Sequence, residues 1–165
     1  MKTVGDLFPD FSMQGVNENN EIIPVDVLTN DWTVVYFYPK DFTFICPTEI
    51  SAMDRLLEEA DVIGISGDNE HCKLAWRREH KDLNKLNQWS FADTEGTLVD
   101  ALGIRSDEGV ALRATFIVDP HNIIQHVSVN NLNVGRNPKE TLRILDALQT
   151  DELCPCNRPV GGDTI

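Results

Sequence analysis

Residues 32–38, with the sequence WTVVYFY, form a continuous apolar run of β-branched and aromatic side chains. Such a run is typical of a strand that is covered on both faces of a sheet. A second run of this kind, DVIGIS, spans residues 61–66. Between the two runs, a helix is expected over residues 47–60, where Ile50, Met53 and Leu57 recur at helical spacing. A buried strand, a helix and another buried strand favour a sheet with helices packed on it.

The rest of the chain continues this alternation. Residues 69–82 predict a charged, mostly exposed helix, and residues 91–104 predict a short strand, a turn and a short helix. Two strands follow, at 114–119 and 122–129, joined by the turn sequence DPHN. The last helix is expected at 138–150. This order predicts an α/β sandwich with a mixed central sheet flanked by helices, and it is compatible with a thioredoxin-like fold.

The length of 165 residues suits one domain with a sizeable core. Its last segment, DELCPCNRPVGGDTI, contains two prolines and two glycines and lacks apolar periodicity. Such a composition favours a mobile tail rather than a packed element. The prediction is therefore one domain over residues 1–150, followed by a C-terminal tail over residues 151–165.

Acidic side chains dominate the composition: 27 Asp and Glu against 14 Lys and Arg give a net charge of −13. A field of this sign repels nucleic acid and anionic membrane surfaces, so neither is an expected partner. No apolar run approaches the roughly 20 residues that span a bilayer. The N-terminal segment MKTVGDLFPDFSM has Asp and Pro where a signal peptide needs its apolar stretch. We therefore expect a cytoplasmic protein.

The number and spacing of the cysteines limit which redox or metal sites the chain can form. The chain contains Cys46, Cys72, Cys154 and Cys156. In a reducing compartment, cysteines are more often redox-active, metal-binding or buried than permanently disulfide-bonded. The absence of a CxxC pair weighs against a thioredoxin-type dithiol and against a zinc ribbon. Cys72 has no neighbour that suggests chemistry, and we interpret it as structural or as a bystander.

Cys46 stands directly before Pro47, at the start of the first expected helix. Proline is favoured at the first helical position, so we expect Cys46 to be the N-cap and Glu49 the third helical residue. The positive end of the helix dipole and its free N–H groups would then stabilise a thiolate. The competing interpretation is a small buried core residue, and position alone does not decide between the two.

Two further features could belong to the same chemistry. Cys154 and Cys156 lie in the expected tail, and a flexible arm can deliver a thiol to a sulfenic acid. The alternatives are an incidental pair or two ligands of an adventitious metal ion. Arg113 precedes the expected strand 114–119, where a guanidinium could stabilise a thiolate or hold a substrate oxygen. An arginine in that position is otherwise a solvated strand end.

Together these segments resemble the peroxiredoxins, in particular the typical two-cysteine type of alkyl hydroperoxide reductase C. The resemblance runs over nearly the whole chain, and its thioredoxin-like α/β fold agrees with the pattern above. The family's active-site pattern Pro-x3-Thr-x2-Cys matches Pro39, Thr43 and Cys46, and the family arginine matches Arg113. The motifs that carry the resemblance are GDLFPDF, YFYPKDFTFICPTE, DVIGISGDNEHCKLAWR, RATFIVDP, VGRN and ELCPCN.

The resemblance implies a thiol-dependent peroxidase that reduces hydrogen peroxide and organic hydroperoxides. Cys46 would attack the terminal peroxide oxygen, become a sulfenic acid and release water or an alcohol. Thr43 would hydrogen-bond the peroxide, and Pro39 would shield the sulfenate from solvent. Arg113 would stabilise the thiolate and polarise the O–O bond.

The resemblance also implies a supporting charged pair and a reaction without added groups. Glu49 and Arg136, the latter in VGRN, correspond to the family pair that orients Arg113. The chemistry needs neither a metal nor an organic cofactor.

The tail matches the family's resolving position at Cys154, which implies a disulfide between Cys46 of one subunit and Cys154 of another. Homodimers would assemble into a ring, a decamer or a dodecamer. Cys156 is a departure, because many relatives have one tail cysteine. Its ELCPCN ending resembles a branch that uses an alkylhydroperoxidase D-like dithiol adaptor or thioredoxin as reductant. We therefore expect Cys156 to relay the disulfide to that reductant, or to resolve Cys46 itself.

Two other classes of function compete with this interpretation. One is a chaperone-like or structural ring, and the other is a disulfide reductase on a thioredoxin fold. The second is disfavoured because Glu49 occupies the place of a second active-site cysteine. Peroxide consumption with a thiol donor, abolished in Cys46→Ser, separates the peroxidase from the chaperone-like ring, and insulin reduction by the purified protein would support the disulfide reductase.

Overall fold

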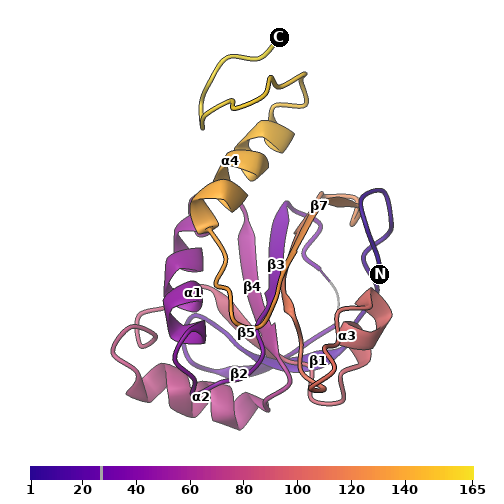
Figure 1. Cartoon of the computed structure of the whole chain (residues 1–165). Coiled ribbons are helices and arrows are strands. Elements are labelled where there is room, and N and C mark those ends of the chain that lie inside the picture. Colours follow the sequence, from indigo (N-terminus) through magenta and orange to yellow (C-terminus); the bar gives the residue numbers. More distant parts are fainter. Residues whose placement is uncertain (27) are drawn as a thin grey trace.

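The computed structural model describes residues 1–26 and 28–165 (Figure 1). Within these residues one mixed sheet has the strand order β2-β1-β5-β4-β3-β6-β7. Its strands are β1 Met13–Val16, β2 Ile22–Val25, β3 Thr33–Phe37, β4 Asp61–Ser66, β5 Trp89–Ala92, β6 Arg113–Val118 and β7 Ile124–Asn130. The helices are α1 Cys46–Met53, the 3-10 helix η1 Asp54–Glu58, α2 Glu70–Glu79, α3 Thr97–Leu102 and α4 Pro138–Gln149.

The strand pairings confirm the prediction of a mixed central sheet. The pairs β3–β4 and β4–β5 are parallel, whereas β3–β6, β6–β7, β1–β5 and β1–β2 are antiparallel. Both β3 and β6 are buried along their whole length. This burial explains why the run at residues 32–38 is continuously apolar: a central strand needs apolar side chains on both faces.

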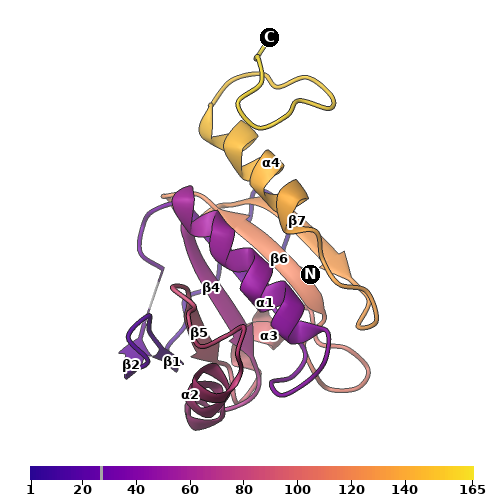
Figure 2. The ribbon, with the colours of Figure 1, turned by 90° about the vertical axis from the view of Figure 1, so that its left-hand side faces the viewer.

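Helices cover both faces of the sheet, and each face has its own apolar core. One core lies under α1, α2 and α4 and includes Tyr36, Cys46, Ile50, Trp76 and Leu145. Figure 2 shows α1 and α4 crossing this face. The other core lies under α3 and the N-terminal segment and is built around Phe8, Phe37, Phe91, Leu98 and Phe116.

Several expected boundaries are corrected by the structure. The helix expected from Pro47 to residue 60 ends at Met53 and continues as the 3-10 helix η1. The helix expected at 69–82 was predicted to be mostly exposed, and that prediction is wrong. In α2, Lys73, Trp76 and Arg77 are all buried. Arg77 is buried because backbone carbonyls accept hydrogen bonds from its guanidinium, among them that of Gln88 at 2.8 Å.

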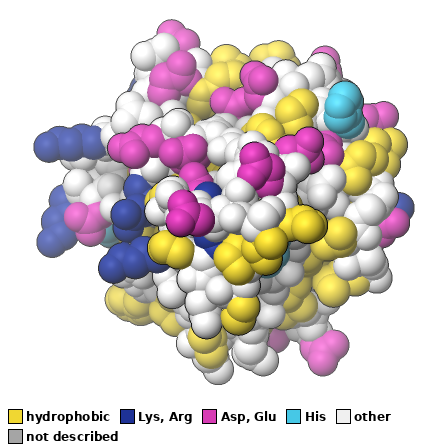
Figure 3. Space-filling view, turned by 90° about the horizontal axis from the view of Figure 1, so that it is seen from above, with side chains coloured by type: hydrophobic (Ala, Val, Ile, Leu, Met, Phe, Trp, Pro, Cys, Tyr) yellow, Lys and Arg dark blue, Asp and Glu magenta, His cyan; other side chains and the backbone are white. Residues whose placement is uncertain are grey.

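The C-terminal tail has no regular secondary structure, but it is not wholly unpacked as expected. Arg158 is 4% exposed, and its Nη1 donates to Asp146 Oδ2 in α4 at 2.8 Å. The same carboxylate accepts from the backbone N–H of Gly161 at 3.0 Å. Acidic side chains are spread over this end of the molecule, with basic ones gathered toward one side (Figure 3). No helix in the described part of the chain is long and apolar enough to cross a bilayer.

Candidate active site

Cys46 is delivered by the loop that joins the end of β3 to the start of α1. The expectation that Cys46 caps this helix is wrong by one residue. Ile45 is the N-cap, because its carbonyl already accepts from the N–H groups of Thr48 at 3.1 Å and Glu49 at 3.3 Å. Cys46 is therefore the first helical residue. Its side chain is 0% exposed and belongs to the apolar core that includes Tyr38.

Arg113 is the first residue of β6, and its guanidinium contacts the sulfur of Cys46. Arg113 Nη1 lies 3.3 Å from Cys46 Sγ, although the two residues are 67 positions apart in sequence. The sheet explains this proximity, since β6 runs antiparallel to β3 with Tyr36 opposite Thr115. The start of β6 therefore lies beside the end of β3. Arg113 Nε also donates to the carbonyl of Leu132 at 2.7 Å, which fixes the orientation of the guanidinium.

Glu49 links this arginine to a second one. Its Oε1 accepts from Arg113 Nη1, and its Oε2 accepts from Arg136 Nε at 2.7 Å and from the Arg136 backbone N–H at 2.9 Å. The three side chains are only 3–5% exposed. Arg136 is itself held by the carbonyl of Ala114 at 2.9 Å. The Glu49 carboxylate and the Leu132 carbonyl thus both hold the guanidinium of Arg113 beside Cys46.

The charges of this cluster leave room for one more anion. Two guanidinium groups, on Arg113 and Arg136, surround one carboxylate, on Glu49. A buried group of this kind carries one uncompensated positive charge, which is unfavourable in a medium of low dielectric constant. Arg113 therefore presents a cationic hydrogen-bond donor to the sulfur of Cys46.

Pro39 and Thr43 lie on the loop that leads to Cys46, and Thr43 uses its hydroxyl within that loop. Thr43 is half-buried, and its Oγ1 donates to the carbonyl of Lys40 at 3.0 Å. Among the described residues, no hydrogen bond joins Thr43 to Cys46. Pro39 is half-buried and lines a small pocket of about 240 Å³ with Lys40, Asp68 and Asp93 among others.

The tail cysteines lie far from this cluster within one chain. Figures 1 and 2 place the tail at one end of the molecule and the start of α1, beside α2, at the other. All four cysteines are free thiols. Cys154 is half-buried, and its thiol donates weakly to the carbonyls of Ala147 and Glu152, at 3.6 Å each. Cys156 is exposed.

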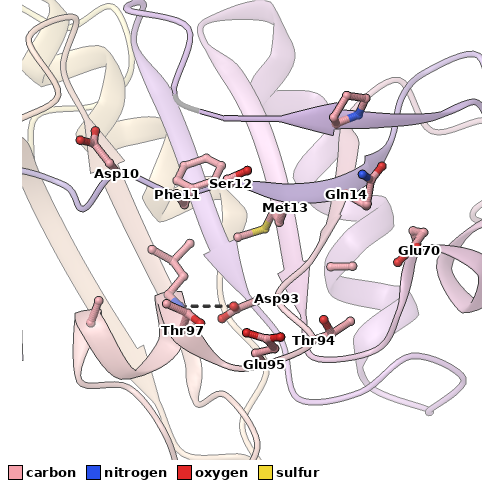
Figure 4. A pocket seen from close by; sticks show the side chains of 14 residues that line it. Asp10, Phe11, Ser12, Met13, Gln14, Glu70, Asp93, Thr94, Glu95 and Thr97 are labelled. Atoms are coloured by element: carbon pink, nitrogen blue, oxygen red, sulfur yellow. Dashed lines mark hydrogen bonds between the residues drawn. The ribbon is translucent and has the colours of Figure 1, made fainter.

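A separate pocket of about 530 Å³ lies between the N-terminal segment and the turn after β5 (Figure 4). Asp93 in its wall accepts from the backbone N–H groups of Leu98 at 3.3 Å and Val99 at 3.0 Å, so its carboxylate serves the start of α3. None of the residues singled out from the sequence lines this pocket. Within the described chain, no cluster of His, Cys, Asp and Glu side chains has the geometry of a metal site.

Comparisons with known proteins agree with the geometry at Cys46. The AhpC/TSA family matches residues 4–127 of the chain. The chain belongs to the AhpC/TSA family of peroxiredoxins. Alkyl hydroperoxide reductase C of Mycolicibacterium smegmatis is 43% identical over 182 aligned residues, covering 99% of this chain and 93% of that protein. The alkyl hydroperoxide reductase C of Mycobacterium tuberculosis is 42% identical with the same coverage.

Solved structures of peroxiredoxins have the same fold. Mycobacterium bovis AhpC has a TM-score of 0.86 at 39% identity, covering 95% of this chain and 98% of that chain. The reduced 2-Cys peroxiredoxin of Plasmodium vivax has a TM-score of 0.90 at 32% identity, covering 99% and 92%. This peroxiredoxin is a thiol-dependent peroxidase with a thioredoxin-like fold, and the expected fold class and enzyme class are confirmed.

Sequence reasoning missed a second buried polar cluster in this peroxiredoxin. Lys73 in α2 is paired with Asp41 in the loop that precedes Cys46, with Nζ 3.2 Å from Oδ1. Both side chains are at most 1% exposed. The available signal was the spacing of Lys73 with Trp76 and Arg77, which places the three on one helical face. That face was interpreted as solvated because two of its three residues are charged.

Cys72 is the free thiol for which the structure supports an inert role. Burial, and then the carboxylates of Asp41 and Asp68, raise the pKa of the Cys72 thiol above its ordinary value. The folded protein therefore holds less thiolate at Cys72 than an unfolded chain at the same pH, and alkylation requires the thiolate. We expect iodoacetamide at pH 8 to modify Cys72 severalfold more slowly in the folded protein than in urea, as measured by peptide mass spectrometry.

The matching expectation is that Cys72→Ser leaves peroxide turnover within about twofold of the unmodified protein, since serine is close to cysteine in size and none of the hydrogen bonds described at Cys46 involves Cys72. Alkylation of Cys72 that is as fast in the folded protein as in urea would contradict the inert role.

Proposed function

We propose that Cys46 is the nucleophile of this peroxidase. Its thiolate attacks the terminal oxygen of a hydroperoxide, the O–O bond breaks, and the sulfur becomes a sulfenic acid. The departing oxygen takes a proton and leaves as water or an alcohol. The observation that supports this proposal is the 3.3 Å contact between Arg113 Nη1 and the fully buried sulfur. A fixed donor at that position can also stabilise charge on the breaking O–O bond.

We assign supporting roles to the residues around the sulfur. Glu49 and Arg136 orient the guanidinium of Arg113, as their hydrogen bonds suggest. Thr43 is proposed to hydrogen-bond the bound peroxide, and Pro39 to shield the sulfenate from water. Both lie on the loop that leads into α1, and the Thr43 hydroxyl needs to exchange its bond with Lys40 for one with the substrate.

The sulfenic acid is proposed to react with Cys154 of a second subunit. The thiol attacks the Cys46 sulfur, an S–S bond forms, the S–O bond breaks, and water leaves with the thiol proton. The position of the tail at the end of the molecule opposite to the start of α1 supports a partner chain as the source (Figures 1 and 2). Strand β7 lies at one edge of the sheet. Its first residue, Ile124, bonds to the backbone of Gly5 and Asp6, and the rest of the strand offers its edge to another copy. We propose a homodimer that assembles further into a ring.

Cys156 is proposed to pass the disulfide on to a dithiol reductant. It is exposed, whereas Cys154 is half-buried, so an external dithiol reaches Cys156 more easily. Thiol–disulfide exchange with Cys154 would give a Cys154–Cys156 disulfide and free Cys46. A reductant of the alkylhydroperoxidase D or thioredoxin kind then accepts the disulfide, in a cytoplasm that keeps thiols reduced.

The experiment is a non-reducing gel after one equivalent of peroxide, run on Cys46→Ser, Cys154→Ser and Cys156→Ser. We expect covalent dimers in Cys156→Ser, where no thiol can relay the disulfide, fewer in the unmodified protein, where the relay converts them to a Cys154–Cys156 disulfide, and none in Cys46→Ser. Covalent dimers that survive in Cys154→Ser would show that Cys156 resolves Cys46 directly.

Turnover of the same variants tests the relay. Cys156→Ser is expected to lose turnover with dithiol proteins. Unchanged turnover with every candidate reductant would contradict the relay, and an absence of any dimer in Cys156→Ser would contradict the disulfide between subunits.

A further inference from the structure

The loop that delivers Cys46 is fastened to α2 by groups that the peroxidase chemistry does not use. Asp41 stands on this loop, five residues before the sulfur, and its side chain is 0% exposed. Lys73 stands in the middle of α2, with 1% of its side chain exposed. Charged groups are rarely buried to this degree unless they are paired. The Asp41–Lys73 pair therefore links the loop before α1 to helix α2, although these two elements are not consecutive in the sequence.

The contacts of the pair form a closed network. Lys73 Nζ lies 3.2 Å from Asp41 Oδ1, 3.2 Å from the hydroxyl of Tyr38, and within hydrogen-bond distance of Ser66 Oγ. Ser66 at the end of β4 donates to Asp41 Oδ1 at 2.8 Å. The Asp41 backbone N–H donates to Asp68 Oδ2 at 2.7 Å. The loop is thus held by α2 and by the residues at the carboxyl end of β4.

A second contact lies one helical turn further along α2. The ring of Phe42 stacks on Trp76, with centroids 5.6 Å apart and planes at 29°. Phe42 has a backbone φ of +56°, in the left-handed region, which a bulky side chain adopts only when its surroundings hold it there. The stack and the Asp41–Lys73 pair therefore keep the loop in a conformation that is unfavourable in isolation.

The disulfide step requires this loop to move. The sulfur of Cys46 is 0% exposed, and a disulfide needs the two sulfur atoms about 2.05 Å apart. Cys154 of another chain reaches Cys46 only after the first turn of α1 and the loop before it leave the core. The contacts of Asp41 and Phe42 with α2 are among those that oppose this movement.

We propose that α2 is a clamp on the Cys46 loop, and that Lys73, through Asp41, is a positioning residue that sets how often Cys46 leaves its pocket. The proposal rests on the proposed roles of Cys46 and Cys154. In the pocket, next to Arg113, the sulfenic acid can react with a second hydroperoxide, which yields a sulfinic acid and an alcohol. Outside the pocket it reacts with the Cys154 thiol and yields a disulfide and water. The clamp thereby sets the ratio of these two products.

The first test compares Lys73→Met, which keeps the length of the side chain, with Arg78→Gln on the exposed face of the same helix. Amide hydrogen exchange of residues 39–46 is measured by mass spectrometry on the reduced full-length protein. We expect at least about tenfold faster exchange of this segment in Lys73→Met, because local opening controls exchange. Arg78→Gln is expected to exchange like the unmodified protein. Unchanged exchange in folded Lys73→Met would overturn the clamp.

The second test uses Phe42→Ala, which leaves the buried pair intact and keeps the proposal testable if Lys73→Met does not fold. Phe42 is 54% exposed, so its removal opens no cavity in the core. We expect faster exchange of the same segment and, at a fixed excess of peroxide, a smaller ratio of Cys46 sulfinate to disulfide. An unchanged ratio in a folded variant with faster exchange would show that opening does not control the products. If the unmodified protein forms no disulfide, the proposed disulfide step fails. Amide hydrogen exchange of residues 39–46 still tests whether α2 holds the loop.

Discussion

Cys46→Ser is expected to abolish peroxide turnover, with a loss of at least about 10³-fold in kcat/KM, because removing a nucleophile removes the whole reaction path. A serine hydroxyl at this position stays protonated near neutral pH and has no accessible counterpart of the sulfenic acid. The change removes little volume from the core, so the fold should persist. Turnover is measured as peroxide consumption with dithiothreitol as the reductant, which avoids any dependence on a specific partner protein.

Cys72→Ser is the matched control, because it makes the same chemical change at a thiol that the structure assigns no role. Its kcat/KM should stay close to that of the unmodified protein. Peroxide consumption by Cys46→Ser at more than a few per cent of the normal rate would refute Cys46 as the nucleophile. It would then place the nucleophile at another residue and leave Cys46 with a structural role only.

The sheet was predictable because its central strands have a simple pattern. Residues 32–38 and 61–66 are continuously apolar, and both prove to lie in the buried middle of the sheet. The local pattern around Cys46 was less decisive, since a helix start suits a reactive thiolate and a small core residue equally well. The N-cap was misplaced by one residue because Pro47 is acceptable at either the first or the second helical position.

The partners of Cys46 could not be derived from local pattern at all. Arg113 reaches the sulfur only because β6 pairs with β3 in one particular register, and no feature of the sequence near Arg113 specifies that register. The resemblance to a family supplied the assignment instead. For Lys73 the sequence pattern was misleading. Lysines are rarely buried unless they are paired, so the pattern predicts exposure, and only the position of Asp41 in the fold shows the pairing.

Glu49 explains why the two arginines can both be buried. One carboxylate oxygen faces Arg113 and the other faces Arg136, so each guanidinium keeps a partner. A change at Arg113 therefore leaves Glu49 paired with Arg136 and should spare the fold. Because a change at Arg113 should affect the reaction and not the fold, Arg113 is the best position at which to measure the contribution of charge to the reaction.

Arg113→Gln is expected to lower kcat/KM for hydroperoxide by about 10² to 10³-fold, the size of effect seen when one preorganised donor to a developing charge is removed. A glutamine offers one neutral N–H group, whereas Arg113 donates at once to Cys46, Glu49 and the carbonyl of Leu132. Arg113→Lys keeps the charge but not the planar set of donors, so we expect an intermediate loss. The measurement is the rate of the first oxidation of Cys46, followed by stopped-flow with tryptophan fluorescence.

Arg105→Gln is the control, since Arg105 pairs with Asp100 at the surface and lies outside the Cys46 cluster. Its oxidation rate should be unchanged, and the melting temperatures of all three variants should show that they are folded. If Arg113→Gln is folded and oxidises at the normal rate, the guanidinium does not assist the reaction. If Arg113→Lys is oxidised as fast as the unmodified protein, a positive charge alone is enough to assist the reaction, and the planar set of guanidinium donors is not needed. The expected order, unmodified above Arg113→Lys above Arg113→Gln, requires both the charge and its fixed position beside the sulfur.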